Sequence, residues 1–434
     1  MKIENSAMEG GSAIKLEISV LSGLQHETVF PKYITGGRKA RFHYLVLELL
    51  GENLKMLKAR SAKNDSWPDG TWSRLGIQCL FAVKKMHDNG FVHRDIKPNN
   101  FAMGLNTSTV HSRSRTVLLF DFGLAREFVR IDKHADGATP PPARGGGGGG
   151  CPKTATSKRS KRNRFSGLLS REKFQPRVLQ APKASSVRVG LENDGSKELA
   201  VTFRVARPHT DFRGTFQYAS PNAHMQKELG RADDVWSLMF MIAEMFVELP
   251  WTSEEIVPVE VVKNQVSLRR IFTADTRHPN RFNRQQEAQL EQIEKMLYEC
   301  NYYSHPNYEL VHQFLYGVMQ TQKGVTWETP YDWEPVKVGD DSTKGRKKSK
   351  TAELWQEPGE FWKTDKWAVL KAPGSVSSQK TKRVPLLIPP PRKKQMSRES
   401  ISVEKHTDSC DPVSAAKSTA KGVWVPPKTS REKH

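Results

Sequence analysis

The chain has 434 residues, 37% of them hydrophobic and 26% charged, and its formal net charge is +21. This length suits one large domain or two ordinary ones. No apolar run approaches the roughly 18 residues of a membrane span, and residues 1–11 lack the basic and then apolar order of a secretory signal. The four cysteines, at positions 79, 151, 300 and 410, are too scattered for a zinc site or a disulfide framework. We therefore expect a cytoplasmic protein, with nuclear residence as the alternative, and no membrane partner.

The first fifty residues predict a small unit rich in strands. Apolar residues at near-helical spacing indicate a helix over Ala13–Leu24. A short strand is expected near Tyr33, followed by a turn at Gly36–Gly37 and a buried strand over Phe42–Leu47.

The following residues predict a larger, mainly helical unit. One helical stripe runs from Trp72 to Asp88 and ends at Gly90, and Thr116–Phe120 is an apolar strand. The stretch Asp234–Glu248 is apolar nearly all round, which indicates a helix buried inside a large domain. Two amphipathic helices are expected further on, at 290–297 and 310–318. A few strands followed mostly by helices predict an α+β domain of two unequal parts.

Two long segments have the composition of disordered chain. The first, 130–207, contains six consecutive glycines and carries 17 Lys and Arg against 6 Asp and Glu, about half of the net charge. The second, 337–434, has further basic runs and three consecutive prolines. Such segments bury too little apolar surface to offset the entropy of the chain. We expect both to be disordered, and their charge would suit acidic partners or nucleic acid.

The strongest indication of chemistry is the run HRDIKPNN at His93–Asn100, followed at position 121 by Asp-Phe-Gly. Phosphoryl transfer needs the acceptor hydroxyl in line with the γ-phosphorus and a metal ion on the phosphate oxygens. Asp95 can accept the hydroxyl proton, and Lys97 can contact the γ-phosphate. Asn100 and Asp121 offer amide and carboxylate oxygens, which suit Mg²⁺. A lone Asp-Phe-Gly is more often a structural turn, but the two runs rarely coincide at this spacing.

These runs, together with RGTFQYASPNAH from Arg213 and GRADDVWSL from Gly230, resemble the protein kinases of the casein kinase 1 superfamily, and most of all its tau-tubulin kinase branch. The resemblance implies a two-lobed protein-kinase fold, with a β-rich N-lobe over 1–50 and a helical C-lobe over 51–336. It implies ATP with Mg²⁺ as cosubstrate and Ser or Thr of a protein as acceptor. The disordered insert 130–207 would then lie in the activation segment, and 337–434 would form a disordered tail.

By the same resemblance, further residues would bind the nucleotide. Lys2 and Glu17 would form the ion pair that orients the phosphates, although a lysine at position 2 also fits an ordinary exposed side chain at a frayed terminus. Leu47 would be the gatekeeper. Glu48 and Leu50 would belong to the hinge, whose backbone hydrogen-bonds adenine.

Two further residues would organise the catalytic loop. Thr215, together with Lys97, resembles the Ser/Thr-type arrangement rather than the tyrosine-kinase type. Asp234 would be the buried helix carboxylate that braces the loop, and the N-cap of that helix is its alternative role.

The sequence departs from the family pattern in three places. No Gly-rich phosphate loop precedes Lys2, so the first strands of the N-lobe are missing and we expect weak binding of Mg·ATP. Gln217 stands where an arginine is expected, which predicts a weak preference for acidic or phosphorylated substrates. Gly123 and Gly214 are 91 positions apart, several times the usual length of this segment. Loop entropy grows slowly with length, so folding tolerates the insertion.

Three functions follow from these observations. A Ser/Thr protein kinase is favoured because Asp95, Lys97, Asn100 and Asp121 occur together. A pseudokinase-like scaffold, which would bind nucleotide weakly and recruit partners through its basic insert and tail, is favoured by the missing Gly-rich loop. A nucleic-acid-associated protein would bind with strong dependence on salt and little dependence on sequence. We expect the first.

Overall fold

The computed structural model describes residues 1–5, 12–105, 113–132, 187–190, 198–252, 258–334, 353–356 and 358–373. All of them belong to one unit of the chain, Met1–Pro389. The glycine run 145–150, the basic cluster 158–164 and the tail beyond position 373 lie outside the described residues.

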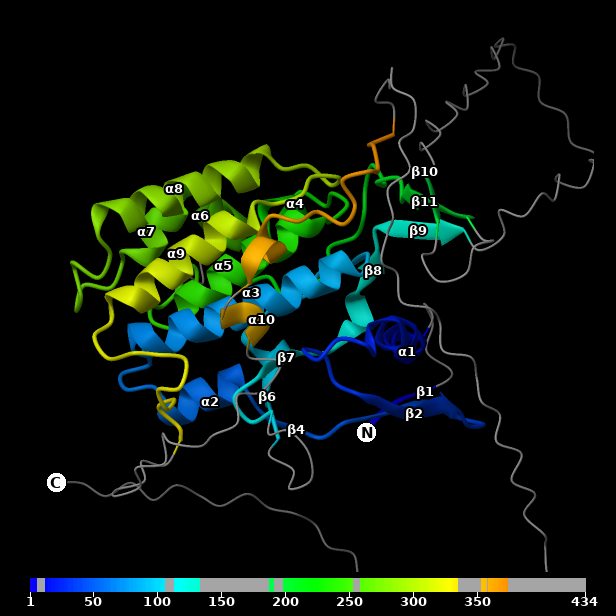
Figure 1. Ribbon diagram of the computed structural model, residues 1–434, viewed down its shortest axis with the longest axis horizontal. Helices are drawn as coiled ribbons and strands as arrows, with labels where there is room; N and C mark the ends of the chain where they lie inside the picture. Colours follow the sequence, from blue (N-terminus) through cyan, green and yellow to red (C-terminus); the bar gives the residue numbers. More distant parts are fainter. Residues whose placement is uncertain are drawn as a thin grey trace, which may run out of the picture. The chain divides into compact units, whose positions relative to one another are not determined.

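A three-stranded antiparallel sheet and one helix form the N-terminal part. The sheet has the order β1 (Lys2–Asn5), β3 (Phe42–Leu47), β2 (Tyr33–Arg38). Helix α1 (Ala13–Leu24) has the predicted bounds and lies between this sheet and the helical part of the chain (Figure 1). The two strands predicted here are also confirmed.

The predicted turn at Gly36–Gly37 is wrong, because both glycines lie inside β2. Gly36 pairs with Leu45 of β3, and Gly37 pairs with Tyr44. A Cβ atom at Gly36 would lie only 2.9 Å from Ile18 Cδ1 of α1. Glycine here permits close packing of the helix on the sheet instead of a turn.

The remaining helices form a larger unit around α3 (Asp69–Asp88) and α5 (Arg231–Glu244). Nearly all side chains of both helices are buried, as the all-round apolar sequence of α5 predicted. Trp72 of α3 stacks on Phe246, with ring centroids 4.6 Å apart. The other helices of this unit are α2 (Leu54–Ser61), α4 (Pro221–His224), α6 (Val259–Gln265), α7 (Leu268–Phe272), α8 (Arg284–Glu299) and α9 (Tyr308–Thr321).

Short strands flank both predicted catalytic runs. They are β4 (Leu50–Asn53), β5 (Phe91–Val92), β6 (Phe101–Gly104), β7 (Val117–Leu119) and β8 (Arg126–Glu127). The first sheet has the order β4-β6-β7, and β5 pairs with β8. The run 93–100 therefore connects β5 to β6, and the run 121–125 lies between β7 and β8.

The predicted disorder of 130–207 is wrong at both ends of that segment. The strands β9 (Val129–Asp132), β10 (Val187–Gly190) and β11 (Glu198–Phe203) form an antiparallel sheet in the order β10-β11-β9. Val201 and Phe203 are buried, and the Phe203 ring lies 6.3 Å from that of Phe128. Val201 and Phe203 alternate with polar residues and give β11 a buried face, which the basic composition of the segment obscured. Residues 133–186 and 191–197 lie outside the described part.

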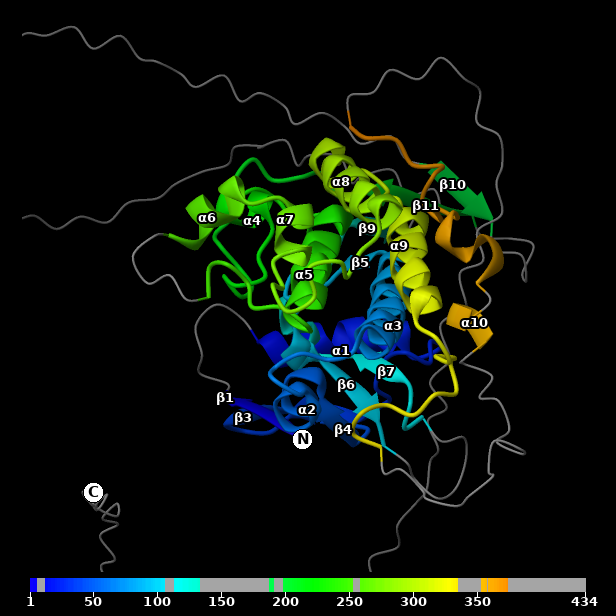
Figure 2. The same ribbon diagram turned by 90° about the vertical axis from the view of Figure 1, so that its left-hand side faces the viewer.

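The predicted disorder of 337–434 is also wrong for 353–356 and 358–373. Helix α10 (Glu353–Gln356) and the 3-10 helix η3 (Gly359–Trp362) run along α3 and α9 (Figures 1 and 2). Trp355, Trp362 and Trp367 each expose at most 4% of their surface. Disordered segments are poor in aromatic residues, so these tryptophans were the available indication of order.

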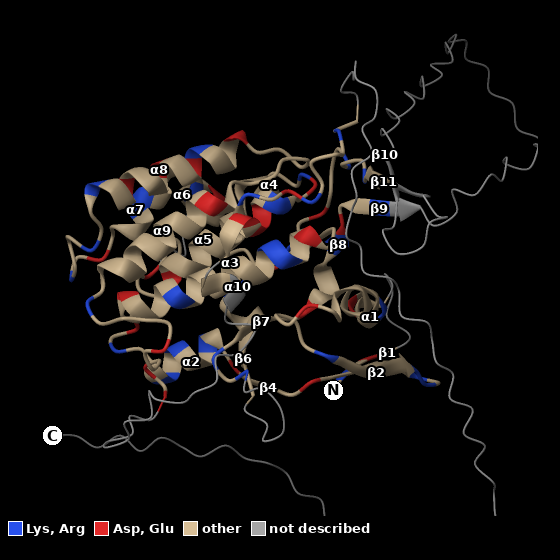
Figure 3. Ribbon diagram, viewed as in Figure 1, with Lys and Arg blue, Asp and Glu red and all other residues tan. Residues whose placement is uncertain are grey.

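Charges of both signs occur on the described helices. Figure 3 shows Lys and Arg interspersed with Asp and Glu along them. About half of the net charge is in 130–207, most of which lies outside the described residues. In the part of the chain that the structure describes, no helix is long and apolar enough to cross a membrane.

Candidate active site

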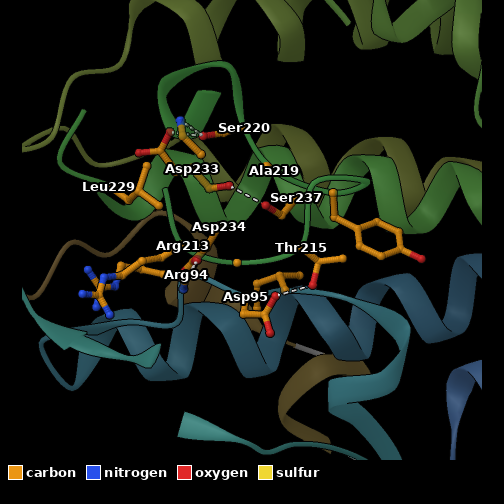
Figure 4. Close-up of a pocket in the computed structure, with 14 residues that line it drawn as sticks. Arg94, Asp95, Arg213, Thr215, Ala219, Ser220, Leu229, Asp233, Asp234 and Ser237 are labelled. Atoms are coloured by element: carbon orange, nitrogen blue, oxygen red, sulfur yellow. Dashed lines mark hydrogen bonds between the residues drawn. The ribbon is translucent and has the colours of Figure 1, made fainter. Parts of the chain in front are cut away.

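Asp95 lies at the centre of a hydrogen-bonded group. Thr215 Oγ1 donates to Asp95 Oδ1 at 2.8 Å, and Lys97 Nζ lies 2.6 Å from Asp95 Oδ2. Lys97 Nζ also donates to Thr215 Oγ1 at 3.0 Å. Figure 4 shows the Asp95 carboxylate and the Thr215 hydroxyl facing each other. Thr215 follows Asp95 by 120 residues, so the far end of the activation segment closes on the catalytic loop.

The segment that carries Thr215 is packed tightly against the loop. Gly214 has φ +104°, and a Cβ atom there would lie 2.7 Å from Arg94 O. Ser220 Oγ donates to Asp233 Oδ1 of α5 at 2.7 Å. The void left between loop and helix measures about 10 Å³, room for one water molecule (Figure 4). Thr215 is thus fixed by its neighbours on both sides.

Asn100 joins the catalytic loop to the strand that leads to Asp121. Its buried amide nitrogen donates to Asp95 O at 2.8 Å, which leaves Oδ1 as its acceptor atom for a metal ion. Phe120 N donates to Asn100 O at 3.0 Å. The residue after Phe120 is Asp121, so the two predicted metal ligands are brought together by backbone pairing.

Lys2 connects the N-terminal sheet to both acidic residues of the site. Lys2 Nζ donates to Glu17 Oε1 of α1 and to Asp121 Oδ1, each at 2.9 Å. Burial alone would lower the pKa of Lys2, but the charges of Glu17 and Asp121 raise it. Burial alone would raise the pKa of Asp121, but the charge and hydrogen bond of Lys2 lower it. Lys2 therefore stays protonated and Asp121 ionised at neutral pH.

The backbone at Asp121 is turned by an unusual conformation. Its φ of 67° and ψ of 72° lie in the left-handed region, which is unfavourable for a residue with a side chain and is found mostly at functional sites. Phe122, the next residue, is fully buried, with its ring 5.8 Å from Phe30 and 5.6 Å from His93. This anchor holds Asp121 beside Lys2.

The predicted gatekeeper and hinge lie between two strands, since Leu47 ends β3 and Leu50 begins β4. The Glu48 carboxylate accepts from Arg113 Nη1 at 2.8 Å and from Lys32 N at 2.9 Å. Glu48 N donates to Lys32 O at 2.9 Å, which ties this residue to the chain before β2. An open hollow beside the hinge is lined by Leu50, Gly51, Glu52, Asn53, Met56, Ala102 and Phe120.

Asp234 braces the backbone of the catalytic loop. Its Oδ2 accepts from His93 N at 2.6 Å and its Oδ1 from Arg94 N at 2.8 Å. Its alternative role as an N-cap is wrong, because α5 begins at Arg231 after the N-cap Gly230. Asp234 instead lies one turn inside the helix, with its carboxylate directed at the loop.

The site residues fit a phosphate-bound magnesium ion. Mg²⁺ in such sites takes one or two protein ligands and keeps water and phosphate oxygens for the rest. No group of three or more His, Cys, Asp or Glu among the described residues could hold a metal ion alone. The Asn100 amide oxygen and the Asp121 carboxylate, which is 44% exposed, are the two oxygen donors that such an ion needs.

Comparison with known proteins identifies the domain. An inactive tau-tubulin kinase of Caenorhabditis elegans is 28% identical over 302 residues, 69% of this chain and 78% of that protein. A second C. elegans protein, provisionally named a serine/threonine-protein kinase, is 28% identical over 364 residues, 83% and 81% of the two chains. A Dictyostelium discoideum protein with a similar provisional name is 31% identical over 327 residues, 74% of this chain and 48% of that protein. Residues 1–139 match the model of the protein kinase domain. The chain contains a protein kinase domain.

The side chain of Gln217, which stands where the family pattern has an arginine, is hydrogen-bonded to Glu244. Its Nε2 donates to Glu244 Oε1 at 2.7 Å, and Tyr218 OH donates to the other Glu244 oxygen at 2.6 Å. Trp251 Nε1 donates to Gln217 O at 2.9 Å. The side chain that departs from the family pattern is therefore part of a polar network inside the domain.

Lys263 of α6, which the sequence analysis did not single out, donates hydrogen bonds to the loop that carries Gln217. Its Nζ donates to Phe216 O at 2.7 Å and to Ala219 O at 2.8 Å. Burial lowers the pKa of Lys263 to about 7, although the charge of Glu260 opposes the shift. Its Nζ also lies 3.3 Å from His224 Nε2. No local motif marks this lysine, because both of its carbonyl partners lie more than 40 residues earlier in the chain.

Glu228 is a second residue that the sequence did not single out. Its carboxylate lies 2.5 Å from Arg207 Nε, 3.3 Å from Arg126 Nε and 3.9 Å from Arg94 Nη1. Burial lowers the pKa of Arg94 to about 10, and the charge of Arg126 adds to the shift. The three arginines come from β8, the catalytic loop and the chain after β11. Glu228 therefore ties both ends of the activation segment to the catalytic loop of the kinase domain.

His87 extends the brace from Asp234 to two further helices. His87 Nε2 lies 2.9 Å from Asp234 Oδ2, and Nδ1 lies 2.6 Å from Tyr308 OH. Burial lowers the pKa of His87, although Asp234 opposes the shift. A neutral imidazole then donates from Nε2 to Asp234 and accepts the Tyr308 hydroxyl at Nδ1. The helical stripe that contains His87 is typical of ordinary core, so its sequence carries no indication of this role.

Proposed function

We propose that this protein is a Ser/Thr protein kinase, which transfers the γ-phosphate of ATP to hydroxyl groups of protein substrates. The observation that carries the proposal is the convergence of Asp95, Lys97 and Thr215, whose polar atoms lie 2.6–3.0 Å apart. The resemblance of this arrangement to the casein kinase 1 superfamily, and to its tau-tubulin kinase branch, supports Ser and Thr as the acceptors.

In the proposed reaction the acceptor oxygen attacks the γ-phosphorus and the bond to the bridging oxygen of ADP breaks. The proton of the hydroxyl passes to the Asp95 carboxylate, and the ammonium of Lys97 balances charge beside the transferring phosphoryl group. Mg²⁺ held by Asn100 and Asp121 would neutralise phosphate oxygens. Lys2, which α1 keeps in place, contacts the phosphates of the nucleotide from the other side.

The adenine would occupy the hinge region. Leu47 limits the depth of the site, and the backbone of Glu48 and Leu50 offers hydrogen bonds to the base. The hollow beside β4 supports this assignment, because it lies between the hinge and Phe120, the residue before Asp121.

A pseudokinase-like scaffold is the second candidate, because one relative that aligns with 69% of this chain is named an inactive tau-tubulin kinase. In that case the same residues would maintain the fold without turning over ATP. The basic insert and tail would then recruit acidic partners or nucleic acid.

Incorporation of label from ATP carrying a radioactive γ-phosphate into a mixed protein substrate separates the two candidates. We expect labelled Ser and Thr with the wild type, and a loss of at least about 10³-fold with Asp95→Asn and with Asp121→Asn. Melting temperatures should change little, since both carboxylates face the site. Asp65→Asn, which removes an exposed carboxylate paired with Lys58 at the surface, is the matched control. Equal labelling by wild type and variants, or none by any, would favour the scaffold.

A further inference from the structure

We propose that residues 353–356 and 358–373, which we call the C-terminal strap, position the catalytic loop and the sheet β9–β11 of the activation segment for phosphoryl transfer. The effect on catalysis rests on the proposed kinase function, whereas the positioning itself rests on the contacts described below. Asp365 and Trp367 of the strap act through other side chains and are therefore positioning residues.

Aromatic side chains dock the first half of the strap onto the helical lobe. The Phe361 and Trp355 rings lie 4.7 and 5.6 Å from the ring of Phe81, in the middle of α3. The Trp362 ring stacks on His312 of α9 with centroids 4.8 Å apart. Trp355 and Trp362 are each 3% exposed, so the strap completes the packing of α3 and α9.

The strap also supplies partners for two buried cations. Lys84 of α3 is fully buried, and its Nζ donates to Thr364 O at 2.9 Å as well as to Asp88 Oδ2. Arg231 of α5 is 2% exposed, and its Nη1 lies 2.9 Å from Asp365 Oδ1. A charge buried without its partner is costly, so the kinase domain depends on the strap to satisfy Arg231.

Asp365 acts on the helix that holds the catalytic loop. Arg231 is the first residue of α5, and Asp234 lies one helical turn further on. Asp234 accepts hydrogen bonds from the backbone amides of His93 and Arg94. The ion pair with Asp365 therefore fixes the helical turn that carries the brace of the loop.

Trp367 acts on the chain just before the catalytic loop. Its Nε1 donates to His87 O at 2.9 Å, at the end of α3. Gly90, which ends that helix with φ +82°, packs under the indole, since a Cβ atom there would lie 3.4 Å from the Trp367 ring. The chain then enters β5 and reaches His93 three residues after Gly90. The indole therefore covers the turn from which the loop starts.

The same indole packs on the activation segment. The Phe128 ring meets Trp367 edge to face at 6.3 Å, and Phe128 N donates to Gly90 O at 2.9 Å. Leu370 of the strap belongs to the same buried cluster as Val201 and Phe203 of β11. The strap thus contacts the chain just before the catalytic loop and Phe128 of the activation segment, and it shares a buried cluster with β11. Because misplacement of catalytic groups by about 1 Å can cost roughly 10²-fold in rate, loss of these contacts should lower turnover.

Variants of the full-length chain test the proposal by two measurements. Trp367→Ala removes the packing and the hydrogen bond, whereas Trp367→Phe keeps a ring and loses only the hydrogen bond. Lys363→Ala alters an exposed strap residue whose partners are Glu309 and Glu360, and it is the matched control. Steady-state kinetics give kcat and the KM for ATP. Hydrogen exchange reports the amides of His93 and Arg94.

We expect Trp367→Ala to lower kcat by about 10- to 100-fold with KM for ATP changed less than about 2-fold, and Trp367→Phe to fall between it and the wild type. The His93 and Arg94 amides should exchange faster in the same order, and Lys363→Ala should match the wild type. Should Trp367→Ala fail to fold, Asp365→Asn, which keeps a hydrogen-bonding group for Arg231, takes its place. Wild-type kcat and wild-type exchange in a folded strap variant would overturn the proposal. A wild type without phosphotransfer would sink the kinase function alone, because the exchange measurement still decides the positioning.

Discussion

Two acidic residues of the kinase domain lie in opposite surroundings. Asp121 is 44% exposed and shares Lys2 with Glu17, so water and ions can reach its carboxylate. Asp234 is 2% exposed and binds only groups of the protein, namely His87, His93 and Arg94. Asp121 thus faces the candidate active site. Asp234 lies behind that site, in the core, and contacts the loop 93–100 from there.

The difference between them indicates how stability and catalysis are divided in this domain. A carboxylate that faces ligand contributes little to folding, because water and ions can solvate it in the empty site. A buried carboxylate that holds three donors leaves all three unsatisfied when it is removed. We therefore expect substitutions near Asp121 to affect activity and those near Asp234 to affect the fold.

The largest expected change in stability follows from Asp234→Ala. It strands the amides of His93 and Arg94 and the imidazole of His87, which should lower the free energy of unfolding by about 3 to 5 kcal/mol. Asp121→Asn, at the exposed carboxylate, should lower it by less than about 1 kcal/mol. Urea unfolding of both variants measures the contrast. Similar losses would show that the two sides are not divided in this way.

A smaller effect, dependent on pH, is expected at Lys263, which belongs to the core side. Its pKa is about 7 in the folded protein against the ordinary 10.5, so between these values the unfolded chain binds the additional proton. The free energy of unfolding should therefore rise with pH across this window, by about 1 kcal/mol per pH unit, and be independent of this lysine below pH 7.

Lys263→Met removes that dependence and serves as the reference. Urea unfolding at several values between pH 7 and pH 10 gives the difference between wild type and variant, in which other titrating groups cancel. Curves that remain parallel over the whole range would contradict the low pKa.

The smallest effect is expected at Gln217, in the loop that also carries Thr215. An arginine at this position would add a positive charge to the loop that carries Thr215. The Glu244 carboxylate, which accepts a hydrogen bond from Gln217, would pair with that charge. We expect Gln217→Arg to raise the preference for a phosphorylated peptide over its unphosphorylated twin by no more than about 5-fold. The double variant with Glu244→Gln should raise it further, because the guanidinium is then free. Arg231 cannot supply the anion-binding charge in place of residue 217, because its Nη1 already pairs with Asp365. A preference unchanged in both variants would mean that no anion pocket forms at this position.

Local sequence was sufficient wherever one short run sets both conformation and chemistry. The runs from His93 and from Asp121 indicated the catalytic loop, and the helix over Ala13–Leu24 has the predicted bounds. In each case the decisive residues lie within about ten positions of each other, so spacing alone carries the information. The roles assigned to Asp95, Lys97, Asn100 and Asp121 remain predictions.

Composition misled where short ordered segments lie inside long basic ones. The strands β9 and β11 and the strap were all predicted to be disordered, because averages over 78 or more residues hide a few buried aromatic and apolar side chains. Gly36 and Gly37 were predicted to form a turn, but they lie inside β2. A glycine that allows a helix to pack closely cannot be distinguished in the sequence from a glycine that a turn needs.

By itself the sequence determined several of the strands and helices, the catalytic runs and the resemblance to a protein kinase, because these depend on neighbours along the chain. Only the tertiary structure decided that Lys2 also reaches Asp121, that Glu228 lies beside three arginines, and that Asp365 and Trp367 contact the first residue of α5 and the end of α3. Those contacts join residues up to about 280 positions apart, and they form only when apolar burial has packed distant elements together. The packed core therefore decides which group pairs with a buried charge, and the neighbouring residues in the sequence do not predict it.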